Sequence, residues 1–412
     1  MTTVSPVYIC VGQCGIQLGQ HVVENMQTNA KDNNTLNRSL IFVDSEKKVV
    51  TRACQTLGEN SGGRIDEKNV ITIRGGCGNN WGLGYLMGKE PFMIDGTFSS
   101  YCTVGERVMD SVRRSVERID SHIMTMLFHS TGGGTGAGLG SHLLELHKEH
   151  YPKAYLHSVT VLPHSAGDTP LQNYNSLFTL TTIQECADSC LLLSNDEGIG
   201  LHKSSVSIAT RCQSYTIEEV NARFTRNILG LYSPAVSLSD SNQTSQLQNL
   251  LSYLSPDNYH KFFTIHQVSS TTATPAYLLK QVIIQKLNTD YAKDKILNTH
   301  SAVLVTRGMK DRDSMHAYTE VKDKITHLLY PASTNSIIDI LHCDGSFPCN
   351  ERSSVTLGLN SSLEKEFFQR VVTNSSLLLS QRAYLHWYHK YGVTDEKFKQ
   401  SIESLSELIA HY

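Results

Sequence analysis

The 412-residue sequence contains no apolar run that approaches the ~20 residues of a membrane-spanning helix. Its start, MTTVSPVYICVGQCG, lacks the basic segment and the long apolar core of a secretory signal peptide. The 36 lysines and arginines nearly balance the 39 aspartates and glutamates, so the net charge of -3 provides no general attraction for nucleic acid or acidic lipid. We therefore expect a cytoplasmic protein whose partners include neither nucleic acid nor a membrane.

The ten cysteines form no C-x-x-C pair, which argues against zinc ribbons and thioredoxin-like redox sites. Without a secretory signal, reduced thiols are the simplest interpretation. The three histidines of HLLELHKEH (142–150) lack the H-E-x-x-H spacing of zinc proteases, so we interpret them as part of a solvated helix face. The chain length predicts two to three domains, at ~100–200 residues each.

Strand and helix patterns alternate through the first half of the chain. Short apolar runs predict strands at 7–11, 39–44, 69–76, 123–129, 156–163 and 189–194, and helical spacing of apolar residues predicts a helix over Val104–Ile119. In the second half, Thr216 and Glu219 form a capping-box pattern, further strands follow, and the chain ends in helices. The alternation favours an α/β fold with a Rossmann-like parallel sheet, followed by a second α/β domain and C-terminal helices.

A glycine-rich run, STGGGTGAGLGS (130–141), lies between a predicted strand and a predicted helix. Such a turn holds phosphate, because main-chain N–H groups and the helix N-terminus face the anion. No lysine follows the glycines, which excludes a Walker loop. Gly132, Gly134 and Ala137 do fit the dinucleotide fingerprint G-x-G-x-x-A, but the acidic ribose partner ~20 residues further on is missing. A flexible surface loop and a dinucleotide-dependent oxidoreductase stay as alternatives.

Three other strand ends carry polar residues: GQCG (12–15), Asp44-Ser45-Glu46, and GGCGNNW (75–81). Ligands bind at the carboxyl ends of parallel strands, so we expect these segments to meet the glycine-rich run at one edge of the sheet. Asp44 and Glu46 suit Mg²⁺ that is bound mostly through water. For these two carboxylates alone, a solvated loop is an equal alternative.

These motifs resemble those of the tubulin superfamily. GGGTGAG is similar to its signature loop, GQCGIQLG to its first phosphate loop and GCGNNWGLGY to the loop that closes over the γ-phosphate. RAYLHWYHKYGVTDEKF resembles the C-terminal helical hairpin, and DTPLQNYNS and TIEEVN follow in the family's order. The resemblance covers nearly the whole chain. It implies a GTP-binding domain over 1–215, a core helix over 216–236, an intermediate domain over 237–358 and C-terminal helices over 359–412.

The resemblance also implies a site for GTP or GDP with Mg²⁺, the metal near Asp44 or Glu46. The nucleotide-binding positions that it implies are Gly12, Gln13, Cys14, Gln17, Gly78, Asn79, Ser130, Gly133, Gly134, Thr135, Gly136, Asp168, Thr169, Asp196, Ile217 and Asn221. Asn79 is expected at the γ-phosphate, Asp168 and Thr169 at the ribose, and Asn221 at the guanine edge.

Three positions depart from the family pattern around the base and the sugar. Gln172 stands where common tubulins have an acid that contacts the ribose, and Asp196 where they have an asparagine that reads guanine. Ile217 replaces the aromatic residue that stacks on the base, a contact that contributes about 1–3 kcal/mol for bases on aromatic side chains. We therefore expect the phosphates to be held more securely than the guanine.

The largest departure concerns hydrolysis. In polymerising tubulins a glutamate of the next subunit orients the attacking water, and here Asn249 takes that position, with Gln246 at a nearby acidic position. Residues 241–256 contain no acid, and Asp240 only precedes them. An amide cannot accept the proton of water, so we expect at most a weak GTPase that activates hydrolysis poorly in a neighbour. A polymer-forming tubulin with assembly-stimulated GTPase activity is the alternative.

Two features favour a specialised member over a bulk microtubule subunit. The lateral-contact loop between Phe263 and Pro275 is short, and the sequence ends at IAHY without the family's acidic tail. The resemblance is to the delta, epsilon and zeta types of centrioles and basal bodies, and GCGNNWGLGY with QNYNSLFTL is most similar to the delta type. We expect a cytoskeletal protein that contacts other tubulin subunits head to tail, as a homo- or hetero-oligomer.

Overall fold

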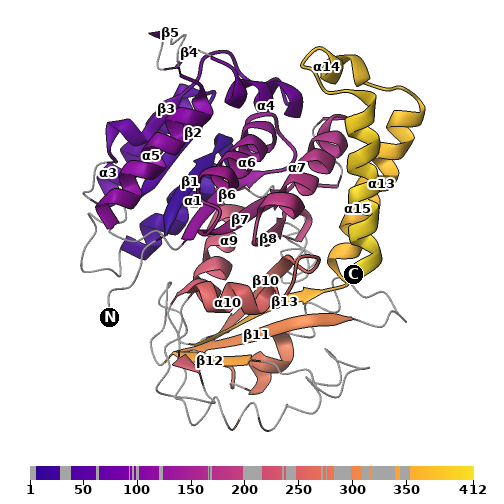
Figure 1. The fold of residues 1–412 in the computed structure, drawn as a ribbon. Coiled ribbons are helices and arrows are strands. Elements are labelled where there is room, and N and C mark those ends of the chain that lie inside the picture. Colours follow the sequence, from indigo (N-terminus) through magenta and orange to yellow (C-terminus); the bar gives the residue numbers. More distant parts are fainter. Residues whose placement is uncertain are drawn as a thin grey trace. The chain divides into compact units, whose positions relative to one another are not determined.

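The computed structural model describes residues 6–27, 39–61, 65–91, 93–94, 97–98, 102–119, 124–165, 167, 169–197, 216–233, 236–237, 247–270, 272–274, 276–282, 298–308, 316, 319, 339–343 and 353–412. The chain divides into two compact units. Unit 1 comprises Met1–Asp196 and Phe367–His411, and unit 2 comprises Glu197–Glu366 with Tyr412. The strands of each unit are described separately (Figure 1).

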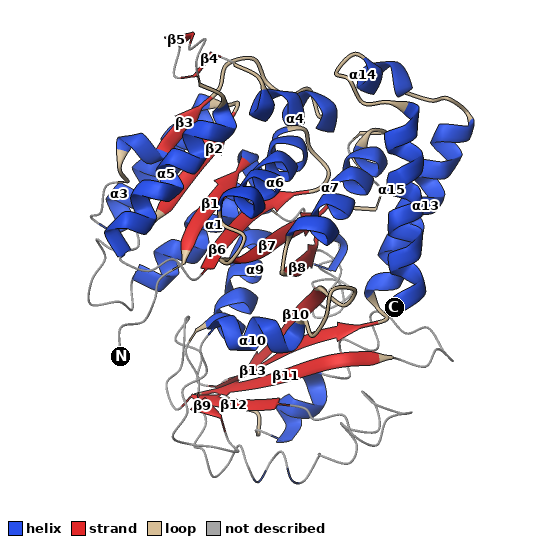
Figure 2. Cartoon of the chain, in the orientation of Figure 1, coloured by secondary structure: helices blue, strands red, loops and turns tan. Residues whose placement is uncertain are grey.

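Unit 1 is built on six parallel strands (Figures 1 and 2). In spatial order they are β3 (Val70–Thr72), β2 (Leu40–Asp44), β1 (Val7–Val11), β6 (Met124–Ser130), β7 (Tyr155–Leu162) and β8 (Ser189–Ser194). Every residue of β1 and β2 is buried, as both faces of a parallel sheet require. The sequence prediction of a parallel α/β sheet is confirmed.

The strand order reverses between β1 and β6. From β1 the chain moves outward to β2 and β3, and from β6 it moves outward the other way to β7 and β8. Helices α1 (Gly12–Gln27) and α3 (Lys47–Ser61) contact each other, whereas α5 (Val104–Ile119), α6 (Gly140–His150) and α7 (Gln172–Cys186) pack in series. A reversal of this kind opens a crevice at the carboxyl ends of the two central strands, which is where doubly wound sheets bind ligands.

Unit 1 also contains several short elements between its main strands and helices. These are η1 (Glu67–Asn69), α4 (Trp81–Lys89), β4 (Met93–Ile94), β5 (Thr97–Phe98) and the π-helical turn η2 (Thr135–Leu139). Beyond them lie the C-terminal helices α13 (Glu364–Ser380), α14 (Leu385–His389) and α15 (Asp395–His411). Phe398 of α15 packs edge-on against Tyr174 and Phe178 of α7, which fixes this hairpin against the unit. Gly392 has a φ of 79°, the left-handed conformation expected at a helix end.

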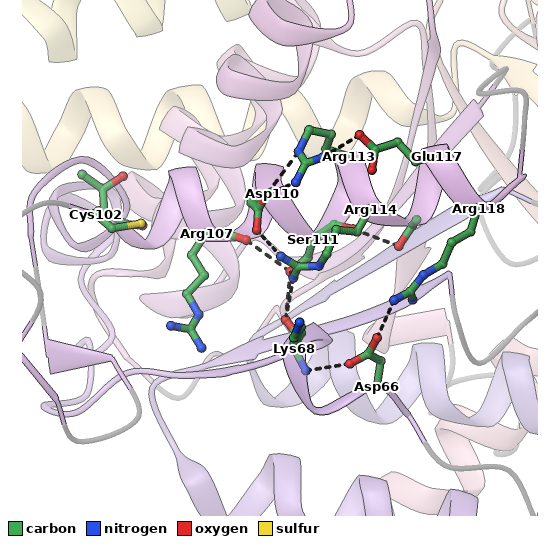
Figure 3. Close-up of polar contacts among 12 residues, drawn as sticks. Asp66, Lys68, Cys102, Arg107, Asp110, Ser111, Arg113, Arg114, Glu117 and Arg118 are labelled. Atoms are coloured by element: carbon green, nitrogen blue, oxygen red, sulfur yellow. Dashed lines mark hydrogen bonds and ion pairs between the residues drawn. The ribbon is translucent and has the colours of Figure 1, made fainter.

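Ion pairs cover the outer face of α5 (Figure 3). Arg113 pairs with Asp110 at 2.7 Å and with Glu117 at 2.5 Å, and Arg114 also pairs with Asp110. Arg118 reaches Asp66 at 2.9 Å, next to η1. Exposed pairs of this kind contribute about 0–1 kcal/mol each. They brace η1 against α5 and neutralise these three arginines.

Unit 2 contains a mixed sheet in the order β10 (Phe262–Ser270), β13 (Ser353–Ser361), β11 (Thr299–Arg307), β12 (Asp339–Cys343) and β9 (Val236–Ser237). Only the pair β11 and β12 is parallel among the pairings described here. Helix α9 (Ile217–Tyr232) packs on β10, β11 and β13, and α10 (Leu247–Leu254) packs on β11 and β13. The predicted capping box is confirmed: the Thr216 side chain accepts from the Glu219 N–H, and Glu219 accepts from the Thr216 N–H.

Two local predictions are wrong. The third strand was expected over 69–76 but ends at Thr72, because Gly75 and Gly76 take φ values of 126° and 62° that a strand does not allow. The prediction of a solvated helix face over 142–150 is wrong for two of its three histidines: His150 is exposed, but His142 and His147 are buried, and the His147 ring lies 2.8 Å from the Thr125 hydroxyl. The stretch contains enough apolar residues for burial on two sides, and α6 does pack against both α5 and α7.

Among the residues that the structure describes, no helix is both long and apolar enough to cross a bilayer. Within the same residues, no three His, Cys, Asp or Glu side chains gather as a metal cluster. The eight cysteines described are all free thiols.

Candidate functional site

The turn after β1 and the loop after β6 touch at the point where the strand order reverses. Gly12 has a φ of +72°, and a Cβ at this position would lie 2.9 Å from the Gly136 backbone nitrogen. Only glycine combines this conformation with so close an approach. The two glycine motifs therefore share one edge of the sheet, as the sequence analysis expected.

Close packing against α4 explains much of the glycine content of the loop. A Cβ on Gly138 would lie 2.0 Å from the Trp81 carbonyl oxygen, and a Cβ on Gly84 would lie 2.2 Å from the Gly134 carbonyl oxygen. Gly133 differs, since the nearest atom to a Cβ there would be the Ser130 hydroxyl at 3.9 Å. Some glycines thus allow backbone to meet backbone, while Gly133 leaves space beside the main chain for a ligand.

His129 holds the glycine-rich loop by a hydrogen bond to its backbone. Its Nδ1 lies 3.0 Å from the Gly136 carbonyl oxygen and its Nε2 lies 2.8 Å from the Ser158 hydroxyl. Complete burial lowers the pKa of His129 to about 4, so the ring is neutral at physiological pH. We assign the Nδ1–H as the donor to Gly136, because a carbonyl oxygen can only accept. The sequence analysis missed this residue, whose one signal was its place immediately before Ser130.

Asp44 is a buried carboxylate at the end of β2. Its Oδ1 accepts from the Ser45 N–H at 2.7 Å, whereas its Oδ2 is buried without a hydrogen-bond partner. Burial raises the pKa of Asp44 to about 6, against the lowering effect of the Ser45 and Glu46 backbone. The Ser45 hydroxyl lies 2.9 Å from that of Thr135, so this strand end adjoins the glycine loop.

The donor set at this edge fits a magnesium ion. A buried carboxylate oxygen that lacks a proton donor is stabilised by a cation, and the neighbouring hydroxyls and the exposed Glu46 supply further oxygen ligands. Mg²⁺ usually keeps several waters and takes few protein ligands beside phosphate oxygens. Asp44 is the stronger of the two predicted metal ligands, because Glu46 is not held in place by burial.

The segment from Gly78 to Trp81 is shaped by a left-handed turn. Gly78 and Asn79 both have φ of 51°, and Asn80 caps α4 by accepting from the Leu83 N–H at 3.1 Å. The Asn79 carbonyl accepts from the Asn175 side-chain amide at 2.8 Å. The Asn79 side chain is exposed at the edge where these strand ends meet, which we call the rim. The sequence analysis expected Asn79 at the γ-phosphate.

Three predicted ligands follow Gly12 in the first turns of α1. Gln13 is exposed, and Cys14 and Gln17 are partly buried. The first turn contains no acidic side chain, so the positive end of the helix dipole is not neutralised there. Burial raises the pKa of Cys14 to about 12, and its thiol therefore stays protonated and is a poor nucleophile.

The predicted ligands of the ribose and the base are less well placed. Asp196 accepts from the Ser165 N–H at 2.9 Å and from its hydroxyl at 3.0 Å, and thus holds the loop after β7. Thr169 lies near the start of α7, and Asp168 lies outside the described residues. In unit 2, Ile217 is 64% exposed at the start of α9 and Asn221 is buried on the same helix.

Asn249, at the position of the family's catalytic acid, lies on α10 and is exposed. Asp240 and Gln246 lie outside the described residues. Of these three residues, Asn249 is therefore the one that the structure describes, and its side-chain amide is exposed.

Comparison with known proteins gives a consistent result. Residues 6–202 match the Tubulin/FtsZ family, GTPase domain. The chain is similar to the tubulin delta chain of Homo sapiens, at 23% identity over 469 positions that cover 99% of both chains, and to that of Mus musculus at 22% over 471 positions, again with 99% of both chains covered. It is 25% identical to the tubulin beta chain of Schizophyllum commune over 442 positions, which cover 98% of this chain and 94% of the relative. The family match includes every strand end that forms the site.

The two kinds of glycine in the loop predict two different mutant phenotypes. Gly138→Ala should destabilise the protein by about 2 kcal/mol or more, because its Cβ meets the fixed Trp81 carbonyl. Gly133→Ala should leave stability nearly unchanged but weaken guanine nucleotide binding, since the methyl group fills space beside the loop. Urea unfolding and titration with a fluorescent GDP analogue measure the two effects. Equal stability loss in both variants would contradict the distinction.

The buried Asp44 predicts an unusual dependence of stability on pH. Its folded-state pKa lies above its usual 3.8, so the folded state holds the proton more tightly and stability falls as pH rises from about 4 through 6. Asp44→Asn should therefore raise the free energy of unfolding of the nucleotide-free protein by up to about 3 kcal/mol at pH 7.5 and by about 1 kcal/mol at pH 4.5.

Asp66→Asn is the matched control for the pH experiment. The Lys68 N–H and Arg118 lower the pKa of Asp66, so its stabilising effect is present at neutral pH and is lost as pH falls. Because both pH values lie above the usual carboxyl pKa of 3.8, its replacement should destabilise the protein by nearly the same amount at pH 7.5 and pH 4.5, whereas the Asp44→Asn effect should be stabilising and should shrink at pH 4.5. Denaturant unfolding at the two pH values tests both variants, and an Asp44→Asn effect independent of pH would refute the assignment.

Proposed function

Because the chain belongs to the tubulin superfamily, as a divergent member, we propose that it is a specialised cytoskeletal protein whose contacts with other tubulin subunits are regulated by bound GTP or GDP. One observation carries the proposal: the turns after β1, β2 and β6 meet where the strand order reverses. Glycine-rich turns at such a reversal can offer main-chain N–H groups to a polyphosphate.

The proposed site assigns roles by position along this edge. The main chain of Gly133, Gly134, Thr135 and Gly136, with the Thr135 hydroxyl and Ser130, would hold the phosphates from one side. The main chain of Gly12, Gln13 and Cys14, with Gln17, would hold them from the other. Gly78 and Asn79 would contact the γ-phosphate. Asp44, with Glu46, would bind Mg²⁺ partly through water. The metal would neutralise phosphate charge and would stabilise the ionised form of Asp44.

The base and the sugar have their own set of proposed ligands. We propose that Asp168 and Thr169 bind the ribose, and that Asp196, Ile217 and Asn221 contact the guanine. The carboxylate of Asp196 can accept from the guanine N1–H and amino group, but it already accepts from Ser165. A weaker preference for guanine than in common tubulins is therefore expected.

The proposed domains follow the order of the domains in the family. We propose a GTP-binding domain over 1–215, a core helix over 216–236, an intermediate domain over 237–358 and C-terminal helices over 359–412. Head-to-tail contact between subunits, in a homo- or hetero-oligomer, would use the α10 surface with Asn249. The similarity to tubulin delta chains supports a specialised role, at centrioles or basal bodies, in preference to bulk microtubules.

Nucleotide binding is tested first. Protein purified without added nucleotide and then denatured should release GTP or GDP, identified by chromatography. Thr135→Val should weaken binding of a fluorescent GDP analogue by roughly 10- to 100-fold, because it loses one hydrogen bond to a charged group worth about 1.5–3 kcal/mol. Thr56→Val, on α3 and remote from the site, is the matched control. Release of NAD, or unchanged affinity in Thr135→Val, would overturn the proposal.

Hydrolysis separates the specialised role from its alternative, a polymer-forming tubulin with assembly-stimulated GTPase activity. Phosphate release per molecule should stay low as protein concentration rises, because an exposed amide at Asn249 cannot accept a proton from water. Asn249→Glu should increase release at high concentration, and Gln248→Glu on the same helix should not. Steeply rising release in the unmodified protein would favour the alternative. If Asn249→Ala left that release intact and Asp240→Ala abolished it, the alignment would be wrong by several residues.

A further inference from the structure

We propose that Asn175 and Tyr388 are positioning residues that couple the phosphate loops to the C-terminal helical hairpin of unit 1. The inference rests on the proposed nucleotide site but concerns residues that do not touch the nucleotide. Asn175 lies on α7 with no exposed surface, so it acts only through its protein neighbours.

The side-chain amide of Asn175 is fully used. Its Nδ2 donates to the Asn79 carbonyl at 2.8 Å and to the Gly132 carbonyl at 2.9 Å. Its Oδ1 accepts from the Trp81 N–H at 2.9 Å and from the Tyr388 hydroxyl at 2.7 Å. An asparagine amide has two donor hydrogens and two acceptor sites, and all four are occupied here. The orientation of the amide is thereby fixed, because the reverse orientation would oppose like groups at four contacts.

These four partners belong to three different parts of the chain. Gly132 is in the glycine loop, Asn79 and Trp81 flank the start of α4, and Tyr388 is in α14. Both loop carbonyls lie on segments proposed to contact phosphates. A shift of either loop on nucleotide binding therefore moves a carbonyl group that is bound by the Asn175 side-chain nitrogen. The side-chain oxygen of Asn175 binds the Tyr388 hydroxyl, so the shift also affects Tyr388.

A second hydrogen bond ties the hairpin to the same segment. The Asn80 side-chain amide donates to the Trp387 carbonyl at 3.1 Å, while its oxygen caps α4. Trp81, Phe178, Tyr388 and Phe398 also share one buried cluster, so the hairpin cannot move freely past α4 and α7. The polar contacts thus lie inside a rigid apolar frame, which is the arrangement needed to transmit a small displacement.

The consequence reaches the protein surface. Trp387 is 49% exposed and Tyr384 is 37% exposed, and both are next to the tied residues of the hairpin. Coupling is reciprocal, so a change that the nucleotide causes in the hairpin implies that a hairpin contact changes nucleotide affinity by the same factor. The conformation of the hairpin surface therefore depends on whether a nucleotide is bound at the phosphate loops.

The test compares two tyrosines of one aromatic cluster. Tyr388→Phe keeps the ring and removes only the hydroxyl, which donates to Asn175 at 2.7 Å and also lies 3.3 Å from the Leu171 carbonyl oxygen. Tyr174→Phe is the control, because that hydroxyl donates to the Ala383 carbonyl at 3.4 Å instead. Hydrogen exchange of residues 79–81 and 385–393 is measured with and without GDP, together with affinity for a fluorescent GDP analogue and the thermal midpoint without nucleotide.

In the unmodified protein, GDP should slow exchange in both segments. Tyr388→Phe should bind GDP about 5- to 10-fold more weakly, and its hairpin exchange should no longer respond to GDP. Tyr174→Phe should stay within 2-fold of the unmodified affinity and keep the response. The thermal midpoints separate a general loss of stability from a loss of coupling.

Two results would overturn the coupling while leaving the nucleotide site intact. One is GDP binding by the unmodified protein with no change of exchange in the hairpin. The other is a Tyr388→Phe variant that binds GDP and responds to it like the unmodified protein. Failure of the unmodified protein to bind GDP at all would instead refute the proposed function, and the coupling with it.

Discussion

The arrangement of unit 1 depends on direct contact between the backbone of the glycine loop and the backbone of α4. At Gly84 and Gly138 a single methyl group would reach within 2.2 Å of a carbonyl oxygen of the opposite segment. This contact places the Asn79–Trp81 segment beside the loop. Asn175 can bridge the two segments only because they are this close. A side chain at either glycine would separate the parts that form the rim.

The chemistry of the rim follows from what burial does to its ionisable groups. His129 is kept neutral and holds a loop carbonyl, and Cys14 is kept protonated. Of the described groups at the rim, the Asp44 carboxylate is the one that a cation would stabilise most, since one of its oxygens is buried without a hydrogen-bond partner. A site of neutral donors with one such carboxylate suits an anionic phosphate that arrives with its own metal ion.

Patterns within short stretches of sequence predicted most of the fold. The strands, the glycine turn and the Thr216 capping box are local, and each is confirmed. The length of β3 and the burial of His142 and His147 were predicted wrongly. His129 and Asn175 were missed as positioning residues. Their importance lies in partners 7 to 213 residues away, and no local pattern indicates such distances.

The sequence by itself determined which strand ends carry glycine, amide and carboxylate groups, because turn chemistry is decided by neighbouring residues. The tertiary structure decided that these ends meet. Strand order is set by which buried strands pair across the sheet, and short buried strands such as β1 and β6 do not specify their neighbours in sequence. Only the reversal between these two strands brings the Gly12 turn to the Gly136 backbone.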